Sequence, residues 1–131
     1  MSITDRPAVA GSRSSAISNL TIRLLTHYTG RGPTRARTYF NDDMVTIVLQ
    51  DILTKAETAL VDSGRTELVL ANRKAFQELM GAELTAGIEE ILQRKVVAFM
   101  SANHVEPDIA VETFLLEPRG EIDVSDGGTS G

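Results

Sequence analysis

The sequence predicts an α+β domain, a two-layer sandwich in which an antiparallel four-stranded sheet carries helices on one face, in the order α-β-β-α-α-β-β. Two pairs of short apolar runs, each pair joined by turn-forming residues, are typical of hairpins. Helical patterns precede the first pair and separate it from the second. Hairpins on either side of a helical pair favour an antiparallel sheet with helices on one side. The length of 131 residues fits one domain.

The first helix is predicted from about Ser15 to Thr29. Ser14 or Ser15 is expected to cap its start, and Gly30 is expected to end it. Its apolar and aromatic side chains recur at helical spacing: Ile17, Leu20, Leu24, Leu25 and Tyr28.

Both ends of the chain are predicted to be disordered tails. Residues 1–13 are rich in Ser, Pro, Gly and Arg without periodicity, and residues 118–131 are acidic and equally aperiodic. The folded domain is therefore expected to span residues 14–117.

The first hairpin is predicted from strands over residues 34–40 and 44–50. A two-residue turn at Asn41-Asp42 would pair Phe40 with Asp43 and leave Arg35 and Arg37 on the polar face. A three-residue loop would instead place both arginines beside apolar side chains of the second strand. We prefer the first register because it buries no charge.

A capping box predicts the next helix. Thr54 and Glu57 have the T-x-x-E spacing, so a helix is expected from there to about Ser63. Gly64 either breaks this helix or weakens it, and a long helix follows from about Thr66 to Gln93. Gly81 and Gly87 inside it suggest close packing or a kink. Its predicted buried stripe is Val69, Phe76, Met80, Leu84, Ile88, Ile91 and Leu92.

The second hairpin, over residues 96–103 and 109–117, is apolar on both faces. A sheet covered on one side alternates apolar and polar residues, so the second face is expected to be covered as well. A second copy of the same sheet is the simplest cover, which predicts a homodimer. Arginines would rim that interface and meet acids such as Glu112, and Phe114 would face either the partner or the helices.

Composition excludes several classes of function. The chain has no Cys, no Trp and only two His, so disulfides, thiolate chemistry, a metal site and a cofactor are not expected. No apolar run is long enough to span a bilayer, and the first residues lack the apolar segment of a secretory signal. We therefore expect a cytoplasmic protein without direct membrane insertion.

A small basic patch is the best candidate site in an acidic chain of net charge -5. Arg31, Arg35 and Arg37 could hold a carboxylate, phosphate or bicarbonate. They could equally form a solvated strand face or ion pairs with the acidic last strand. Arg73 is expected on the surface of its helix, or reaching the sheet edge to fix an acid. These four arginines are the candidate anion or partner contacts.

The pattern resembles the C-protein family of the bacterial membrane-potential-generating system over about Ile17 to Glu117. The landmarks are G-R-G-P at residues 30–33, an Arg-bearing strand with an acidic turn, L-T-x-A-E at 53–57 and S-G-R at 63–65. Arg73 followed by Phe76 and the final V-E-T-F-L-L-E complete them. Gln93-Arg94 departs from the expected Thr-Gly turn, which leaves the helix end open.

The resemblance implies a small protein linked to a bacterial system that moves cations or inorganic carbon across the membrane. It supplies no catalytic residues. We expect a non-enzymatic accessory or regulatory protein, with a place in a membrane complex, that binds a protein or a small anion. The alternative is an RNA-binding module of K-homology type. One glycine where that module needs G-x-x-G, and a pI near 5.0, argue against nucleic acid.

Overall fold

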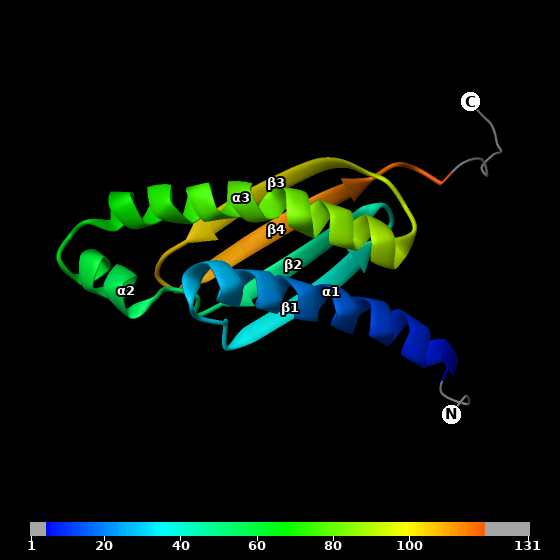
Figure 1. The fold of residues 1–131 in the computed structure, drawn as a ribbon, viewed down its shortest axis with the longest axis horizontal. Coiled ribbons are helices and arrows are strands. Elements are labelled where there is room, and N and C mark those ends of the chain that lie inside the picture. The colour runs from blue at the N-terminus through cyan, green and yellow to red at the C-terminus, as the bar shows by residue number, and fades with distance from the viewer. Residues whose placement is uncertain (1–4, 120–131) are drawn as a thin grey trace.

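The computed structural model describes residues 5–119 and confirms the predicted α+β class and element order. Two layers form it: a four-stranded sheet, and two long helices that lie across the same side of that sheet (Figure 1). The elements are α1 (Asp5–Thr29), β1 (Arg35–Asn41), β2 (Met44–Gln50), α2 (Lys55–Asp62), α3 (Thr66–Leu92), β3 (Val96–His104) and β4 (Ile109–Leu116).

The sheet is antiparallel throughout, with the strand order β1-β2-β4-β3. The two hairpins therefore join through β2 and β4, which places β1 and β3 at the edges. Side chains alternate between the two faces of a strand, so the register decides which residues face the helices. Val45, Ile47, Leu49 and Phe114 face them and are buried.

Helix α1 begins at Asp5, so the predicted start at Ser15 is wrong. The predicted tail over residues 1–13 overlaps α1 from Asp5 onward, and residues 1–4 lie outside the described part of the chain. Pro7 sits in the first turn, where a backbone N–H has no partner within the helix anyway. Ser14 does not cap the helix; its hydroxyl donates to the Thr38 carbonyl at 3.3 Å. Of the predicted C-terminal tail, residues 120–131 are likewise outside the described range.

The first hairpin turns at Asp42-Asp43, one residue later than predicted. Asn41 pairs with Met44 and Phe40 with Val45. Asp42 has φ of 55°, a left-handed conformation that Asp tolerates better than most residues. The observed pairing differs from the predicted one by two positions, and an even displacement leaves every side chain on its predicted face.

The α2 capping box is present as predicted. The Thr54 hydroxyl accepts from the Glu57 N–H at 3.1 Å, and the Glu57 carboxylate accepts from the Thr54 N–H at 3.0 Å. Gly64, with φ of 83°, separates α2 from α3. Helix α3 ends at Leu92, and Gln93 takes the left-handed conformation at its C-terminus. The sequence left this end open because the turn lacks a glycine.

The core lies between the sheet and the two long helices. Ile17 and Leu25 from α1 meet Met80, Leu84 and Ile88 from α3 over the buried side of the sheet. Phe76, Ile91 and Leu92 of the predicted α3 stripe are only half-buried, whereas Arg73 and Gln77 are buried. Polar residues therefore occupy part of the α3 face that the apolar periodicity predicted to be entirely apolar.

Candidate functional site

The face of the sheet opposite the helices is uncovered within residues 5–119, and the register arranges it in rows across all four strands. One row runs Tyr39, Thr46, Thr113, Met100, and the next runs Arg37, Val48, Val111, Ala102. We call this surface the open face. Several of its apolar side chains are exposed, and they are Tyr39, Met44, Met100 and Leu115. An exposed apolar group of this kind is typical of an interaction surface.

Two exposed arginines give the open face its charge. Arg35 and Arg37 project from β1, and no strand residue on this side of the described sheet is a carboxylate. Neither guanidinium makes an ion pair within residues 5–119. The expected pairing with Glu112 is wrong, because Glu112 faces the helices and is 1% exposed.

The four candidate arginines do not form one cluster. Arg31 lies in the loop before β1, and its Nε donates to the Asp51 carbonyl at 3.2 Å. Arg73 is buried on the other side of the sheet. Only Arg35 and Arg37 share the open face, so the four candidate arginines lie in three separate places.

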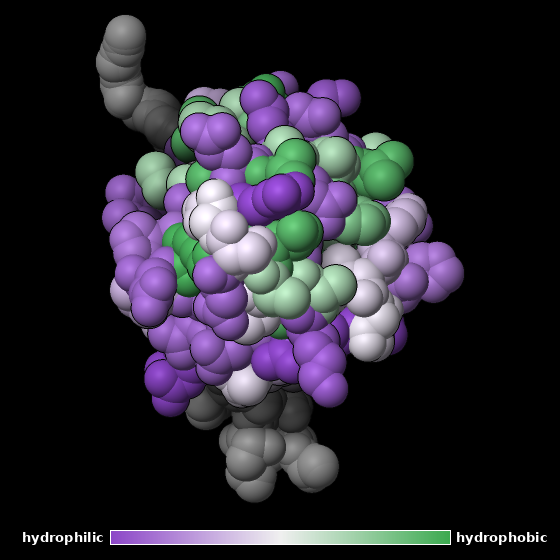
Figure 2. All heavy atoms as spheres, turned by 90° about the vertical axis from the view of Figure 1, so that its left-hand side faces the viewer, coloured by the Kyte–Doolittle hydropathy of each residue, from purple (hydrophilic) through white to green (hydrophobic). Residues whose placement is uncertain are grey.

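The end of the molecule that holds α2 differs from the open face. There the hydrophobic residues form small groups interrupted by hydrophilic ones (Figure 2). The exposed apolar residues of the open face instead share neighbouring rows of one sheet. The open face is therefore the better candidate for a docking surface.

A second polar feature lies beneath the helices. Arg73, in the first third of α3, pairs with Asp108 at 2.8 Å, and the two side chains are 5% and 13% exposed. Asp108 also accepts the Leu53 N–H at 2.7 Å. Arg73 thus reaches the sheet end and fixes an acid, as one of the two sequence-based expectations had it.

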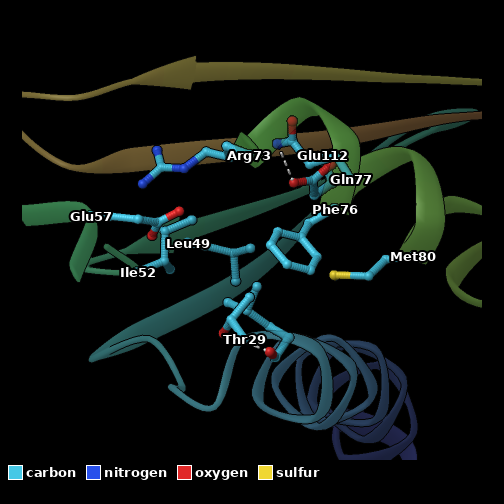
Figure 3. Close-up of a pocket in the computed structure, with 10 residues that line it drawn as sticks. Thr29, Leu49, Ile52, Glu57, Arg73, Phe76, Gln77, Met80 and Glu112 are labelled. Carbon is cyan, nitrogen blue, oxygen red and sulfur yellow. Dashed lines mark hydrogen bonds between the residues drawn. The ribbon is translucent and has the colours of Figure 1, made fainter. Parts of the chain in front are cut away.

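Glu112 forms the centre of a buried polar group on β4. Ser101 donates to one of its oxygens at 2.5 Å. The Gln77 amide donates to the other at 2.8 Å (Figure 3). Asn103 exchanges two hydrogen bonds with Gln77, at 3.0 and 2.9 Å. Burial raises the pKa of Glu112, while the two hydrogen bonds and the charge of Arg73 oppose that rise.

A cavity of about 20 Å³ adjoins these side chains and holds about one water-sized molecule. The side chains that line this space include the polar Glu57, Arg73, Gln77 and Glu112 and the apolar Phe76 and Met80 (Figure 3). Arg73 Nη1 is buried and has no hydrogen-bond partner within the described residues. The space is too small for an organic ligand, so this group is best understood as a polar part of the core.

The substitution Glu112→Gln is expected to stabilise the protein increasingly as pH rises. The raised pKa of Glu112 means that the folded state holds a proton that the unfolded state has lost. Stability from Glu112 is therefore complete below its ordinary pKa and is lost as pH rises through the folded value. A glutamine at this position has no proton to lose, so urea melts from pH 4 to 8 should show wild type and variant diverging. Glu117→Gln, at an exposed position after β4, is the control, and a pH-independent difference for Glu112→Gln would contradict the assignment.

Sequence reasoning missed most of this buried group. Gln77, Ser101 and Asn103 carry no motif, and only a three-dimensional contact relates α3 to β3. Among residues 5–119, no three His, Cys, Asp or Glu side chains are grouped so that they could hold a metal ion.

Comparison with known proteins identifies the family. A family model described as the Na⁺-translocating membrane potential-generating system (MpsC) matches residues 10–118. The chain is also 30% identical over 92 residues to Uncharacterized protein YrhF of Bacillus subtilis (strain 168), a match that covers 69% of this chain and 75% of that protein. No solved structure gives a significant match.

No helix within residues 5–119 has the length and apolar character needed to cross a bilayer. The family match extends over the whole sandwich, from the first half of α1 to the residues after β4. Landmarks such as the α2 capping box and the Arg-bearing strand β1 lie within it. The chain therefore belongs to the MpsC family, named for the Na⁺-translocating membrane potential-generating system.

Proposed function

We propose that this chain is a non-enzymatic accessory component of a membrane-potential-generating system and that it docks onto a partner protein through the open face. Membership of the MpsC family supports the link to such a system. One structural observation carries the docking surface: exposed apolar residues and two arginines share a sheet face that, among the described strands, has no carboxylate. An apolar centre with a charged rim is the usual composition of a protein interface.

The positive charge of the open face favours a partner with an acidic surface. Arg35 and Arg37 need acidic groups opposite them, and a second copy of the open face would present arginines and no acid from its described strands. Two copies stacked face to face would thus leave four guanidinium groups without carboxylates. We therefore propose a different protein with an acidic, partly apolar surface, and a face-to-face homodimer becomes an outcome of the test.

Arg31 and Arg73 are not part of the proposed surface. Arg31 braces the loop that carries Asp51, and Arg73 is paired inside the domain. Of the four arginines expected to bind a small anion or a partner, only Arg35 and Arg37 therefore stay in the proposed site. On this proposal they bind carboxylates of the partner protein.

The test places a photo-crosslinking amino acid at Tyr39, which is exposed on the open face, and separately at Leu79, which is exposed on α3. Crosslinking in the native bacterium, followed by mass spectrometry, should join the Tyr39 variant to a membrane component of the system. The Leu79 variant should give no such product. Equal yields at the two positions, or products of the chain with itself at Tyr39, would contradict the proposal.

Charge reversal tests the arginines with the crosslinked component purified in detergent. Arg35→Glu combined with Arg37→Glu should weaken binding about tenfold or more, because two attractions become repulsions. Arg23→Glu combined with Arg65→Glu changes the net charge equally at exposed positions away from the open face. Wild-type binding should weaken with added salt. Equal losses in the two double variants would show that net charge, rather than the open face, governs binding.

A further inference from the structure

The two edge strands of the sheet, β1 and β3, differ in charge and in the contacts that cover them. At the β1 edge, α1 lies beside the strand: Ser14 donates to the Thr38 carbonyl, and the Ser18 and Thr38 hydroxyls hydrogen-bond at 2.8 Å. Arg35 and Arg37 add charge along the same strand. A covering helix and charged side chains are the means by which proteins block an edge from pairing with another chain.

The β3 edge carries no charged side chain within residues 5–119, although α3 packs against it through Phe99 and the strand has a register shift between Val96 and Ala98. Its nine residues, VVAFMSANH, include no Lys, Arg, Asp, Glu or Pro, and β3 pairs only with β4. Val97 and Met100 are more than half exposed. A long, uncharged edge strand presents a row of free backbone groups to which another strand can be added.

Space for a partner lies directly beside this strand. A surface hollow of about 490 Å³ is lined by both α3 and β3, and a second of about 500 Å³ is lined by α3 and Phe99; Phe99 and Glu78 line both of them. Gly81 lets the Phe99 ring lie close against α3, since a Cβ there would be 2.8 Å from the ring Cε2. The helix and the strand are therefore tightly packed.

The hollows hold charges of both signs, which a second copy of this chain would bring together. Lys74 lines one hollow, near Asn103, and Glu89 lines the other, where its carboxylate also accepts the Val96 N–H at 2.9 Å; Glu78 lines both. Strands that pair antiparallel across a two-fold axis bring the first half of one α3 beside the second half of the other. Each Lys74 then approaches the hollow that holds Glu89 of the other copy. Between them, the short side chains of Ala82 and Ala86 leave room for the approach.

We infer that two copies of the chain pair antiparallel through their β3 edges and join their sheets into one continuous sheet. The main-chain hydrogen bonds of the new strand pair and the filled hollows stabilise the dimer. The open faces of the two copies become one surface, with the arginines at its two outer ends. The inference rests on the β3 edge alone, so it is independent of the proposed docking partner.

The absence of cysteine allows a clean crosslinking test. Single variants Ala98→Cys, Met100→Cys and Ala102→Cys place a thiol at successive positions on the same side of β3. Tyr39→Cys is the matched control, because Tyr39 and Met100 are the two ends of one row across the sheet. Under mild oxidation, the β3 variant nearest the two-fold axis should form a covalent dimer at least about tenfold faster than Tyr39→Cys. A disulfide needs Cβ atoms about 4 Å apart, which only residues near that axis satisfy.

Light scattering of the wild-type chain at about 100 µM supplies the second measurement. It should report twice the monomer mass of 14.2 kDa, and Ala102→Lys should shift the mass towards monomer while leaving the circular dichroism spectrum unchanged. A wild-type monomer at this concentration would overturn the inference. A dimer that crosslinks at Tyr39 as fast as at β3 would also overturn it, because that result requires another interface.

Discussion

Replacing Phe114 with glutamate is expected to leave the chain unfolded at room temperature. Phe114 is fully buried on the helix-facing side of β4 and stacks on Phe99, with ring centroids 4.8 Å apart. Loss of a buried aromatic ring costs about 3–5 kcal/mol, and an ionised carboxylate in its place adds a desolvation cost. The total free energy of unfolding of a domain of this size is about 5–15 kcal/mol. Circular dichroism and a urea melt measure the result.

The adjacent residue is the matched control. Leu115 points to the open face and is 37% exposed, so Leu115→Glu should fold and keep a cooperative melt. It should, however, impair docking through the open face, because it places an acid on a surface proposed to bind acidic groups. A Phe114→Glu chain that melts like wild type, or a Leu115→Glu chain that unfolds, would mean that the two faces of β4 have been assigned the wrong way round.

The second large effect is expected at Arg73. Arg73→Met removes one partner of a buried ion pair and leaves the Asp108 carboxylate without its counter-charge. Removing one member of such a pair costs about 3–5 kcal/mol. The charge of Arg73 also lowers the pKa of Glu112, so the variant should raise that pKa further and extend the pH range over which stability falls.

Arg94→Met is the control for this substitution. Arg94 pairs with Asp43 at 2.7 Å; Arg94 is 14% exposed, but Asp43 is 42% exposed, so its carboxylate stays hydrated when Arg94 is lost. Loss of this pair should cost about 1 kcal/mol or less. Adding Asp108→Asn to Arg73→Met should restore part of the lost stability, since Asn keeps an acceptor for the Leu53 N–H without the charge. Equal midpoints for Arg73→Met and Arg94→Met in urea would refute the buried-pair assignment.

Several predictions made from sequence depend on local physics and are confirmed. The T-x-x-E spacing predicted the start of α2, because the capping bonds join residues only three positions apart. Gly64 separated α2 from α3, and period-two alternation defined the strand over residues 44–50. The predicted register placed Arg35 and Arg37 on the face opposite the helices, and this is confirmed although the turn lies one residue later. The pairing is shifted by two positions, and a shift by an even number leaves each side chain on the same face.

Other predictions failed because contacts distant in sequence decided them. The start of α1 was missed because its first residues carry no apolar stripe, and the predicted cap, Ser14, bonds instead to β1 across 24 positions of sequence. The sequence showed Glu112 as one acid of an acidic strand. Its burial beneath α3 follows from the strand order and from the side chains of Gln77 and Ser101.

The sequence by itself determined the order of the elements and the two faces of the first hairpin, because helical and strand periodicities act over a few residues. Only the tertiary structure decided that β2 pairs with β4, which makes β1 and β3 the edges and leaves β3 as an edge strand without charged side chains. It also separated the arginines, sending Arg73 into the core and Arg35 and Arg37 to the open face. The physical reason is that strand order and helix placement follow from burying the shared apolar faces of distant segments, and no local pattern records which segments those are.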